Sequence, residues 1–179
     1  MASDAPLSVA APSNGDWMGA CLRLARRHRG LTGTNPSVGT LLVKHGRVIG
    51  RGITAKGGRP HAERVALDQA GAEAAGSDAY VTLEPCAHHG ATPPCAQALI
   101  DAGVAKVHTA YIDPDHRVDG KGHAMLREAG ITVHAGEGSA VAGADMRGYL
   151  TRKRLGRPAV TLKLAVSADG MLGRAGEEV

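Results

Sequence analysis

The feature that most constrains this chain is a set of three metal-binding side chains that come from separate parts of the sequence. His61 lies far upstream of Cys86, and Cys95 follows Cys86 after nine positions. An imidazole and two thiolates are ligands that zinc prefers, and three protein ligands leave the fourth position of a tetrahedral zinc open for water. A fold that uses this set must bring all three side chains to one point.

A carboxylate accompanies the proposed ligands. Glu63 follows His61 by two residues, and Pro85 directly precedes Cys86. Zinc lowers the pKa of a bound water from 15.7 to about 7, and a nearby carboxylate can then move the protons. His-x-Glu followed by Pro-Cys and a second Cys is the signature of zinc deaminases that act on nucleobases. The pattern therefore indicates a catalytic zinc site with Glu63 as the proton carrier.

Each part of this pattern also has a simpler explanation. His-x-Glu pairs occur by chance on surface helices, and a free cysteine often packs as a small buried hydrophobic residue. A structural zinc site would be closed by a fourth ligand, which His88 or His89 could supply. The order of the residues favours the catalytic site, and the closed structural site stays open as an alternative.

Further motifs extend the similarity beyond the metal-binding residues. They are Asn-Pro-Ser-Val-Gly at 35–39, Pro-His-Ala-Glu at 60–63, Thr-Leu-Glu-Pro-Cys at 82–86, His-Gly at 89–90, Thr-Pro-Pro-Cys at 92–95, Asp-Pro at 113–114 and Gly-Arg-Pro at 156–158. With these motifs the chain resembles, from Trp17 to about Gly170, the bifunctional deaminase/reductase of riboflavin biosynthesis. Other cytidine-deaminase-like enzymes have the motif Pro-Cys-x-x-Cys, whereas this chain resembles the riboflavin family in having a loop inserted between its cysteines.

The resemblance implies roles for individual residues. His61, Cys86 and Cys95 would bind zinc, and Glu63 would be the proton shuttle. Asn35 stands where the family has a substrate-contacting asparagine. His88 and His89 lie in the inserted loop, where they would contact the substrate or simply face solvent, and we predict His89 as the contact.

The chain departs from the family pattern at several positions. Thr34 stands where the family has Pro, and Ala87 and Ala91 stand where it has Ser and Arg. Asp115-His116 replaces an Asn-Pro pair. No ligand is lost, but the change at Ala91 removes a cation from the loop nearest the site.

Composition limits the compartment and the partners. Three cysteines cannot pair completely, and two thiolates that hold a metal imply a reducing, cytoplasmic environment. Residues 1–14 lack the features of a signal peptide, and no stretch is long and apolar enough to span a membrane. The formal net charge is +4, but one Trp, three Tyr and no Phe offer few surfaces for stacking bases. We therefore expect a phosphorylated small substrate rather than a nucleic acid, with its phosphate held by one of the loop cations Lys56, Arg59, Arg117 or Lys121.

The apolar pattern predicts an alternation of strands and helices. Short β-rich runs occupy 38–43, 48–53, 79–83, 104–112 and 131–133, and the first two are joined at His45-Gly46, a hairpin signal. Helical patterns occupy 14–30, 61–70, 95–102 and 123–129, and Asn14-Gly15-Asp16 can cap the first of them. This order predicts a three-layer α/β/α fold with a mixed sheet of the cytidine-deaminase-like type. Within it, His61 and Cys95 should both lie at the start of a helix.

We expect four segments along the chain. Residues 1–14 form a disordered tail, 15–146 a zinc deaminase domain, 147–157 a basic helix and linker, and 158–179 a remnant of the first strand of a reductase domain. The chain would then be a truncation or a natural fragment, or another chain would supply the reductase. We expect no reductase activity, and a segment beyond Pro158 that is either poorly ordered or used in a homo-oligomer contact.

The predicted function follows from the resemblance. It is the zinc-dependent hydrolytic deamination of 2,5-diamino-6-(5-phosphoribosylamino)pyrimidin-4-one to the aminouracil, with release of ammonia. The alternatives are a deaminase of cytidine, guanine or tRNA adenosine, and a non-catalytic binding module that zinc stabilises.

Overall fold

A mixed five-stranded sheet forms the centre of the computed structural model, which describes residues 15–90 and 93–172. Its strand order is β2-β1-β3-β4-β5. β1 pairs antiparallel with β2 and β3, while β3, β4 and β5 are parallel to one another. The strands are β1 Gly39–Lys44, β2 Arg47–Ile53, β3 Asp78–Val81, β4 Lys106–Thr109 and β5 Thr132–Ala135. The predicted mixed sheet is confirmed.

The β1–β2 hairpin turns where the sequence predicts it. His45 and Gly46 both have positive φ, at 49° and 72°. Two residues with positive φ give a turn whose twist matches that of the two strands. β1 is buried on both faces, since Leu41 and Val43 enter one core cluster while Leu42 enters the other.

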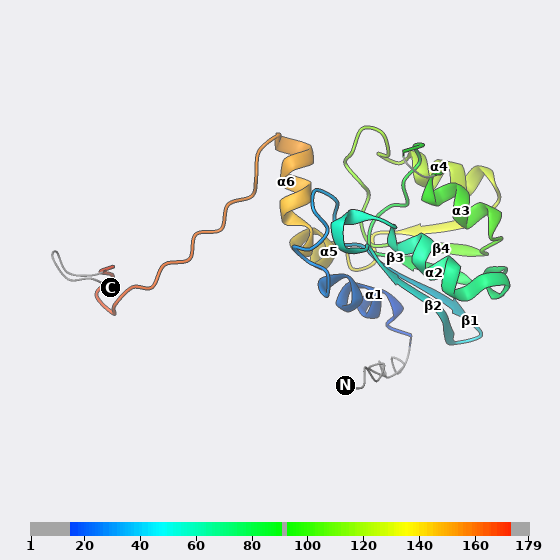
Figure 1. Cartoon of the computed structure of the whole chain (residues 1–179), viewed down its shortest axis with the longest axis horizontal. Helices are drawn as coiled ribbons and strands as arrows, with labels where there is room; N and C mark the ends of the chain where they lie inside the picture. Colours follow the sequence, from blue (N-terminus) through cyan, green and yellow to red (C-terminus); the bar gives the residue numbers. More distant parts are fainter. Residues whose placement is uncertain (1–14, 91–92, 173–179) are drawn as a thin grey trace.

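Helices cover both faces of the sheet (Figure 1). α2 Ala62–Ala70, α3 Cys95–Asp101 and α4 Lys121–Glu128 contribute to one core cluster, and α1 Trp17–Arg26, α5 Ser139–Asp145 and α6 Arg147–Leu155 contribute to the other or lie beside it. Two 3₁₀ turns complete the fold, η1 Lys56–Gly58 and η2 Gly71–Ala74. In the described part of the chain, no helix is long and apolar enough to cross a membrane.

Several element boundaries differ from the prediction. The first helix starts at the predicted cap, where Asp16 Oδ1 accepts from Gly19 N at 2.9 Å, but it ends at Arg26 rather than near residue 30. The run at 104–112 contains only the short strand β4, because the chain beyond Thr109 leaves the sheet as a loop. α5 was not predicted, since its Ala- and Gly-rich sequence has no apolar periodicity. The predicted tail, 1–14, lies outside the described residues.

The segment after α6 extends away from the sheet (Figure 1). Its alternating apolar residues Val160, Leu162, Leu164 and Val166 are between 54% and 77% exposed. Residues 158–166 belong to no strand of the described structure. Its assignment as the start of a reductase domain stays a prediction.

Close packing of α2 on β2 generates a stability prediction. A Cβ at Gly52 would overlap the backbone carbonyl oxygen of Ala62, the residue after His61. Because backbone cannot yield as a flexible side chain does, we expect Gly52→Ala to lower the free energy of unfolding by about 1–3 kcal/mol. Chemical denaturation measures the change.

Gly148→Ala is the matched control, because Gly148 lies in α6 with nothing within 4 Å of an added Cβ. Alanine is the better helix former, so this variant should gain up to about 1 kcal/mol. Equal effects of the two substitutions would contradict the packing argument.

Candidate active site

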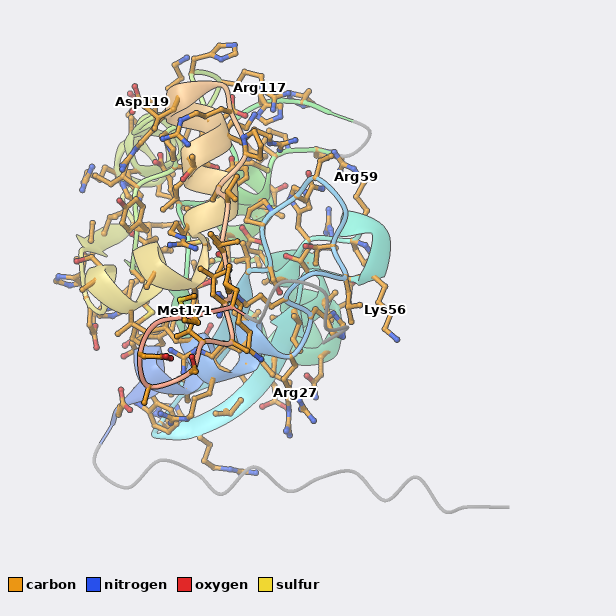
Figure 2. All side chains as sticks on the ribbon, turned by 90° about the vertical axis from the view of Figure 1, so that its left-hand side faces the viewer. Arg27, Lys56, Arg59, Arg117, Asp119 and Met171 are labelled. Atoms are coloured by element: carbon orange, nitrogen blue, oxygen red, sulfur yellow. The ribbon has the colours of Figure 1, made fainter. Side chains whose placement is uncertain are left out.

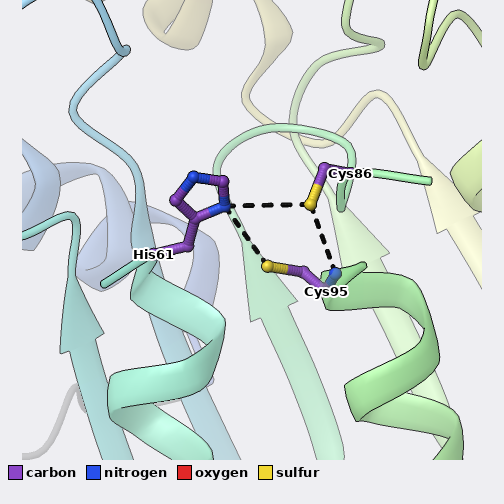
Figure 3. Close-up of side chains that lie close together, drawn as sticks. All are labelled: His61, Cys86 and Cys95. Atoms are coloured by element: carbon purple, nitrogen blue, oxygen red, sulfur yellow. Dashed lines mark hydrogen bonds between the residues drawn. The ribbon is translucent and has the colours of Figure 1, made fainter. Parts of the chain in front are cut away.

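Three segments bring His61, Cys86 and Cys95 together. His61 is the N-cap of α2, Cys95 is the first residue of α3, and Cys86 lies in the loop after β3. His61 Nδ1 is 3.8 Å from Cys86 Sγ and 3.4 Å from Cys95 Sγ (Figure 3). All three donor atoms lie within 4.8 Å of one another, so they can share one metal ion. The predicted placement of His61 and Cys95 at helix starts is confirmed.

The donor set fits an open zinc site. One nitrogen and two sulfur ligands leave a tetrahedral zinc with a free position. Among the residues that the structure describes, this group contains no fourth His or Cys. His88 and His89 are described but do not join it, so the geometry favours the open site over the closed structural one.

Hydrogen bonding prepares the cysteines for a metal. Cys95 N donates to Cys86 Sγ at 3.2 Å. Hydrogen bonds from the Cys95 thiol, from His61 and from this backbone N–H lower the pKa of the Cys86 thiol to about 4, against the effect of burial. The pKa of Cys95 is raised, first by its hydrogen bond to Cys86 and then by burial. Zinc binds cysteine as the thiolate, so a metal held by these residues would displace any remaining thiol proton.

Glu63 lies in the first turn of α2 and lines the same cavity as His61 and Cys86. Its side chain is buried, and this burial raises the pKa of the carboxyl to about 7. A carboxyl with a pKa near neutrality can both accept and release a proton at working pH. The position and acidity of Glu63 therefore suit a proton carrier.

The cavity has a volume of about 370 Å³ and a strongly polar wall. Beyond His61, Glu63 and Cys86, its polar lining comes from Thr34, Asn35, Thr54, Arg59, Glu84, His88, Asp113, Asp115, Arg117, Tyr149, Arg152 and Lys153. The cavity is thus large enough for a small substrate and lined by both carboxylates and cations.

Of the two residues predicted to contact the substrate, only one lines the cavity. Asn35 lines the cavity, and its Nδ2 donates to Gly58 O at 2.9 Å, which fixes the side chain. His89 is exposed and does not line the cavity, whereas the neighbouring His88 does. Adjacent loop residues point in different directions, and the sequence does not show which one faces inward. The substrate contact assigned to His89 stays a prediction that this cavity does not support.

The predicted phosphate-binding cations also divide into two groups. Arg59 and Arg117 line the cavity, while Lys56 and Lys121 do not. Figure 2 shows the separation of Lys56 from Arg59 and Arg117.

The sequence did not point to the contribution of α6. Tyr149, Arg152 and Lys153 line the cavity, although we predicted this segment as a basic helix and linker. The only sequence signal was its concentration of basic residues, which is equally typical of a solvated surface. Arg152 Nη2 donates to Thr34 O at 2.6 Å, which ties α6 to the loop that carries Asn35.

Glu84 holds the opposite loop of the cavity in place. Its buried carboxylate accepts four backbone N–H groups, from Asp113 at 3.2 Å, Gly120 at 3.0 Å, Gly122 at 2.9 Å and His123 at 3.2 Å. These bonds also satisfy free N–H groups in the first turn of α4. Glu84 therefore fixes the loop that presents Asp113, Asp115 and Arg117 to the cavity.

Comparison with known proteins identifies the family. A family model described as the cytidine and deoxycytidylate deaminase zinc-binding region matches residues 12–111. This chain belongs to that deaminase family. The match covers more than half of the deaminase and includes His61, Glu63, Cys86 and Cys95.

The chain spans less than half the length of the curated relatives that it matches. The riboflavin biosynthesis protein RibD of Haemophilus influenzae is 51% identical over 90% of this chain, which spans 44% of that relative. Acinetobacter baumannii RibD superimposes with a TM-score of 0.86 at 47% identity, over 92% of this chain and 46% of the other. A third relative is a diaminohydroxyphosphoribosylaminopyrimidine deaminase/5-amino-6-(5-phosphoribosylamino)uracil reductase from Thermotoga maritima. It superimposes with a TM-score of 0.81 at 36% identity, over 87% of this chain and 45% of the other.

The His61, Cys86 and Cys95 group generates a metal-binding prediction. We expect about one zinc per chain of the purified protein, by the three-ligand count. Cys86→Ala or Cys95→Ala should abolish it, because either change leaves only two ligands. Cys21→Ala is the control, since Cys21 is buried elsewhere with its thiol on Tyr80 O at 3.1 Å. Elemental analysis checks this, and zinc retained in both ligand variants would place the metal elsewhere.

Glu84→Gln tests the loop anchor. A glutamine side chain has one acceptor oxygen, and its NH₂ group replaces the second oxygen of the carboxylate. The backbone N–H groups that bonded to that second oxygen would therefore face another donor. Each buried polar group left unsatisfied costs about 1–3 kcal/mol. We therefore expect Glu84→Gln to lower the free energy of unfolding by about 2 kcal/mol or more. Glu73→Gln, at an exposed position, should change stability little. Similar denaturation midpoints for the two variants would show that Glu84 does not hold the loop.

Proposed function

We propose that this chain hydrolyses the exocyclic amine of 2,5-diamino-6-(5-phosphoribosylamino)pyrimidin-4-one and releases ammonia in riboflavin biosynthesis. The observation that carries the proposal is the high identity to RibD proteins over nine-tenths of the chain. The name of the Thermotoga maritima relative supplies the substrate class. A cavity that combines a His/Cys/Cys group with a buried carboxyl and several cations supports the same substrate.

The proposed ligands are His61, Cys86 and Cys95. Zinc held by these residues would lower the pKa of a water molecule and so supply a nucleophile at neutral pH. Glu63 accepts one proton from the water and delivers it to the ring nitrogen, and then takes the second proton from the added hydroxyl and passes it to the departing amine. A carbon–oxygen bond replaces the carbon–nitrogen bond, and the amine leaves as ammonia. The buried position of Glu63 keeps bulk water from competing for these protons.

We assign the phosphate end of the substrate to the cationic side of the cavity. Arg59 Nη2 lies 3.1 Å from the position of a Cβ on Gly90, so the guanidinium lies beside the inserted loop. This is the loop in which Ala91 replaces the arginine expected from the resemblance, and Ala91 itself lies outside the described residues. Arg59 would supply a cation beside the described part of this loop, and Arg152 lines the same cavity.

We also infer a cytoplasmic location and the absence of a nucleic-acid partner. All three cysteines are free thiols, and a site that needs two of them as thiolates requires a reducing compartment. A homo-oligomer contact through the exposed apolar residues of 160–166 belongs to the same proposal.

Ammonia release from a panel of substrates tests the proposed reaction. We expect turnover of the diaminopyrimidine ribose phosphate and none of cytidine, guanine or tRNA adenosine. Activity on one of these alternatives alone would overturn the assignment. A protein that binds zinc but releases no ammonia from any of them would instead be a non-catalytic binding module.

Glu63→Gln tests the proton carrier. The variant should keep its zinc and lose roughly 10²–10⁴-fold in rate, as expected when a general acid–base group is removed. Glu128→Gln, at an exposed position in α4, is the matched control and should retain full activity. Unchanged turnover in Glu63→Gln would exclude this role for Glu63.

A further inference from the structure

A buried carboxylate with two cations forms part of the cavity wall. The Asp115 side chain is only 3% exposed, yet it accepts from Arg117 Nε at 2.9 Å, Arg117 Nη2 at 2.7 Å and Lys153 Nζ at 2.5 Å. The hydrogen bond from Arg117 is the main reason that the pKa of Asp115 lies well below its usual range. Asp115 is therefore charged at neutral pH.

This trio joins two distant segments. Asp115 and Arg117 belong to the loop between β4 and α4, whereas Lys153 belongs to α6. All three line the cavity that contains His61 and Glu63. The family-model match ends at residue 111, so the trio lies outside the region that the chain shares with the wider deaminase family. Residues of this kind can distinguish one substrate from another without altering the shared chemistry.

A second contact fixes the same two segments. Tyr149 Oη donates to the Asp113 carboxylate at 2.8 and 3.0 Å, and Asp115 N donates to Asp113 Oδ1 at 2.9 Å. Tyr149 and Lys153 are four residues apart on α6, so they lie on the same face of the helix. The helix thus holds the loop through two neighbouring carboxylates.

The charges in the trio do not cancel. Arg117 and Lys153 outnumber Asp115, which leaves one net positive charge on the trio. Without Lys153 the trio would be neutral, and with neither Lys153 nor the Asp115 charge it would again be positive through Arg117. The position where the resemblance predicts asparagine thus carries a carboxylate together with a compensating lysine.

We propose that Lys153 is a specificity-determining positioning residue, which offsets Asp115 so that this wall attracts the phosphate of the substrate. The inference rests on the proposed function, because it assumes an anionic substrate in this cavity. It makes α6 a functional wall of the deaminase site. A merely structural tether would act on stability and affect charged and uncharged substrates alike, whereas charge balance acts on the phosphorylated substrate and can be restored by a second substitution.

The experiment compares Lys153→Met, Asp115→Asn and the double variant with the wild-type protein. We expect Lys153→Met to raise KM for the phosphorylated substrate by about tenfold, from the Coulomb energy of one charge lost at close range. Its kcat, its zinc content and its KM for the dephosphorylated substrate should stay near wild-type values. The double variant should return KM to near the wild-type value, because the trio again carries one net positive charge.

Lys163→Met is the matched control, since Lys163 is exposed on the extended segment after α6. It should leave KM unchanged although it removes the same charge from the chain. An unaltered KM in Lys153→Met would overturn the inference. So would an equal rise for the dephosphorylated substrate, or a double variant that stays as impaired as Lys153→Met.

The role of Lys153 can be tested even if the proposed function is wrong. If the wild-type protein releases no ammonia from the diaminopyrimidine, calorimetric binding of ribose 5-phosphate to the same proteins decides the inference. Binding that weakens in Lys153→Met and recovers in the double variant would support it. Absent binding to the wild-type protein, or equal binding to all variants, would overturn it.

Discussion

The meeting of two helix starts with the loop after β3 is the arrangement on which the site depends. His61 and Cys95 each begin a helix on the same face of the sheet, and Cys95 N donates to Cys86 Sγ. Close packing holds these helices in place, as where Gly52 allows β2 to approach the backbone of α2 at Ala62. The sheet therefore acts as a rigid support, which a metal site needs if its ligands are to keep their geometry.

The cavity divides into a wall for chemistry and a wall for selection. The His/Cys/Cys group and Glu63 come from the region that matches the deaminase family. Across the cavity, Glu84 fixes the loop of Asp113 and Asp115, and α6 holds that loop through Tyr149 and Lys153. Such a division lets the reaction stay constant while the substrate changes, because Asp113, Asp115, Tyr149 and Lys153 lie beyond the shared region.

Local signals explain which elements the sequence could predict. The hairpin at His45-Gly46 and the helices that start at His61 and Cys95 have short-range signatures, and all three are confirmed. The strand predicted at 104–112 is longer than β4, because an apolar stretch does not show where a strand leaves its sheet. α5 was missed because it has no apolar stripe. His88 rather than His89 lines the cavity, which depends on the path of a loop that no local pattern describes.

The sequence by itself determined the metal-binding chemistry, because ligand type, order and spacing are properties of the chain. The sequence shows the Asp-Pro pair and the cluster of basic residues near the end of the chain, but it does not show that these two segments contact each other. Only the tertiary structure decided that Lys153 meets Asp115, since they are 38 residues apart and on different elements. Charged residues are abundant on any surface, and which of them pair depends on how α6 packs against the sheet. The selective half of the site therefore emerges only when the chain is folded.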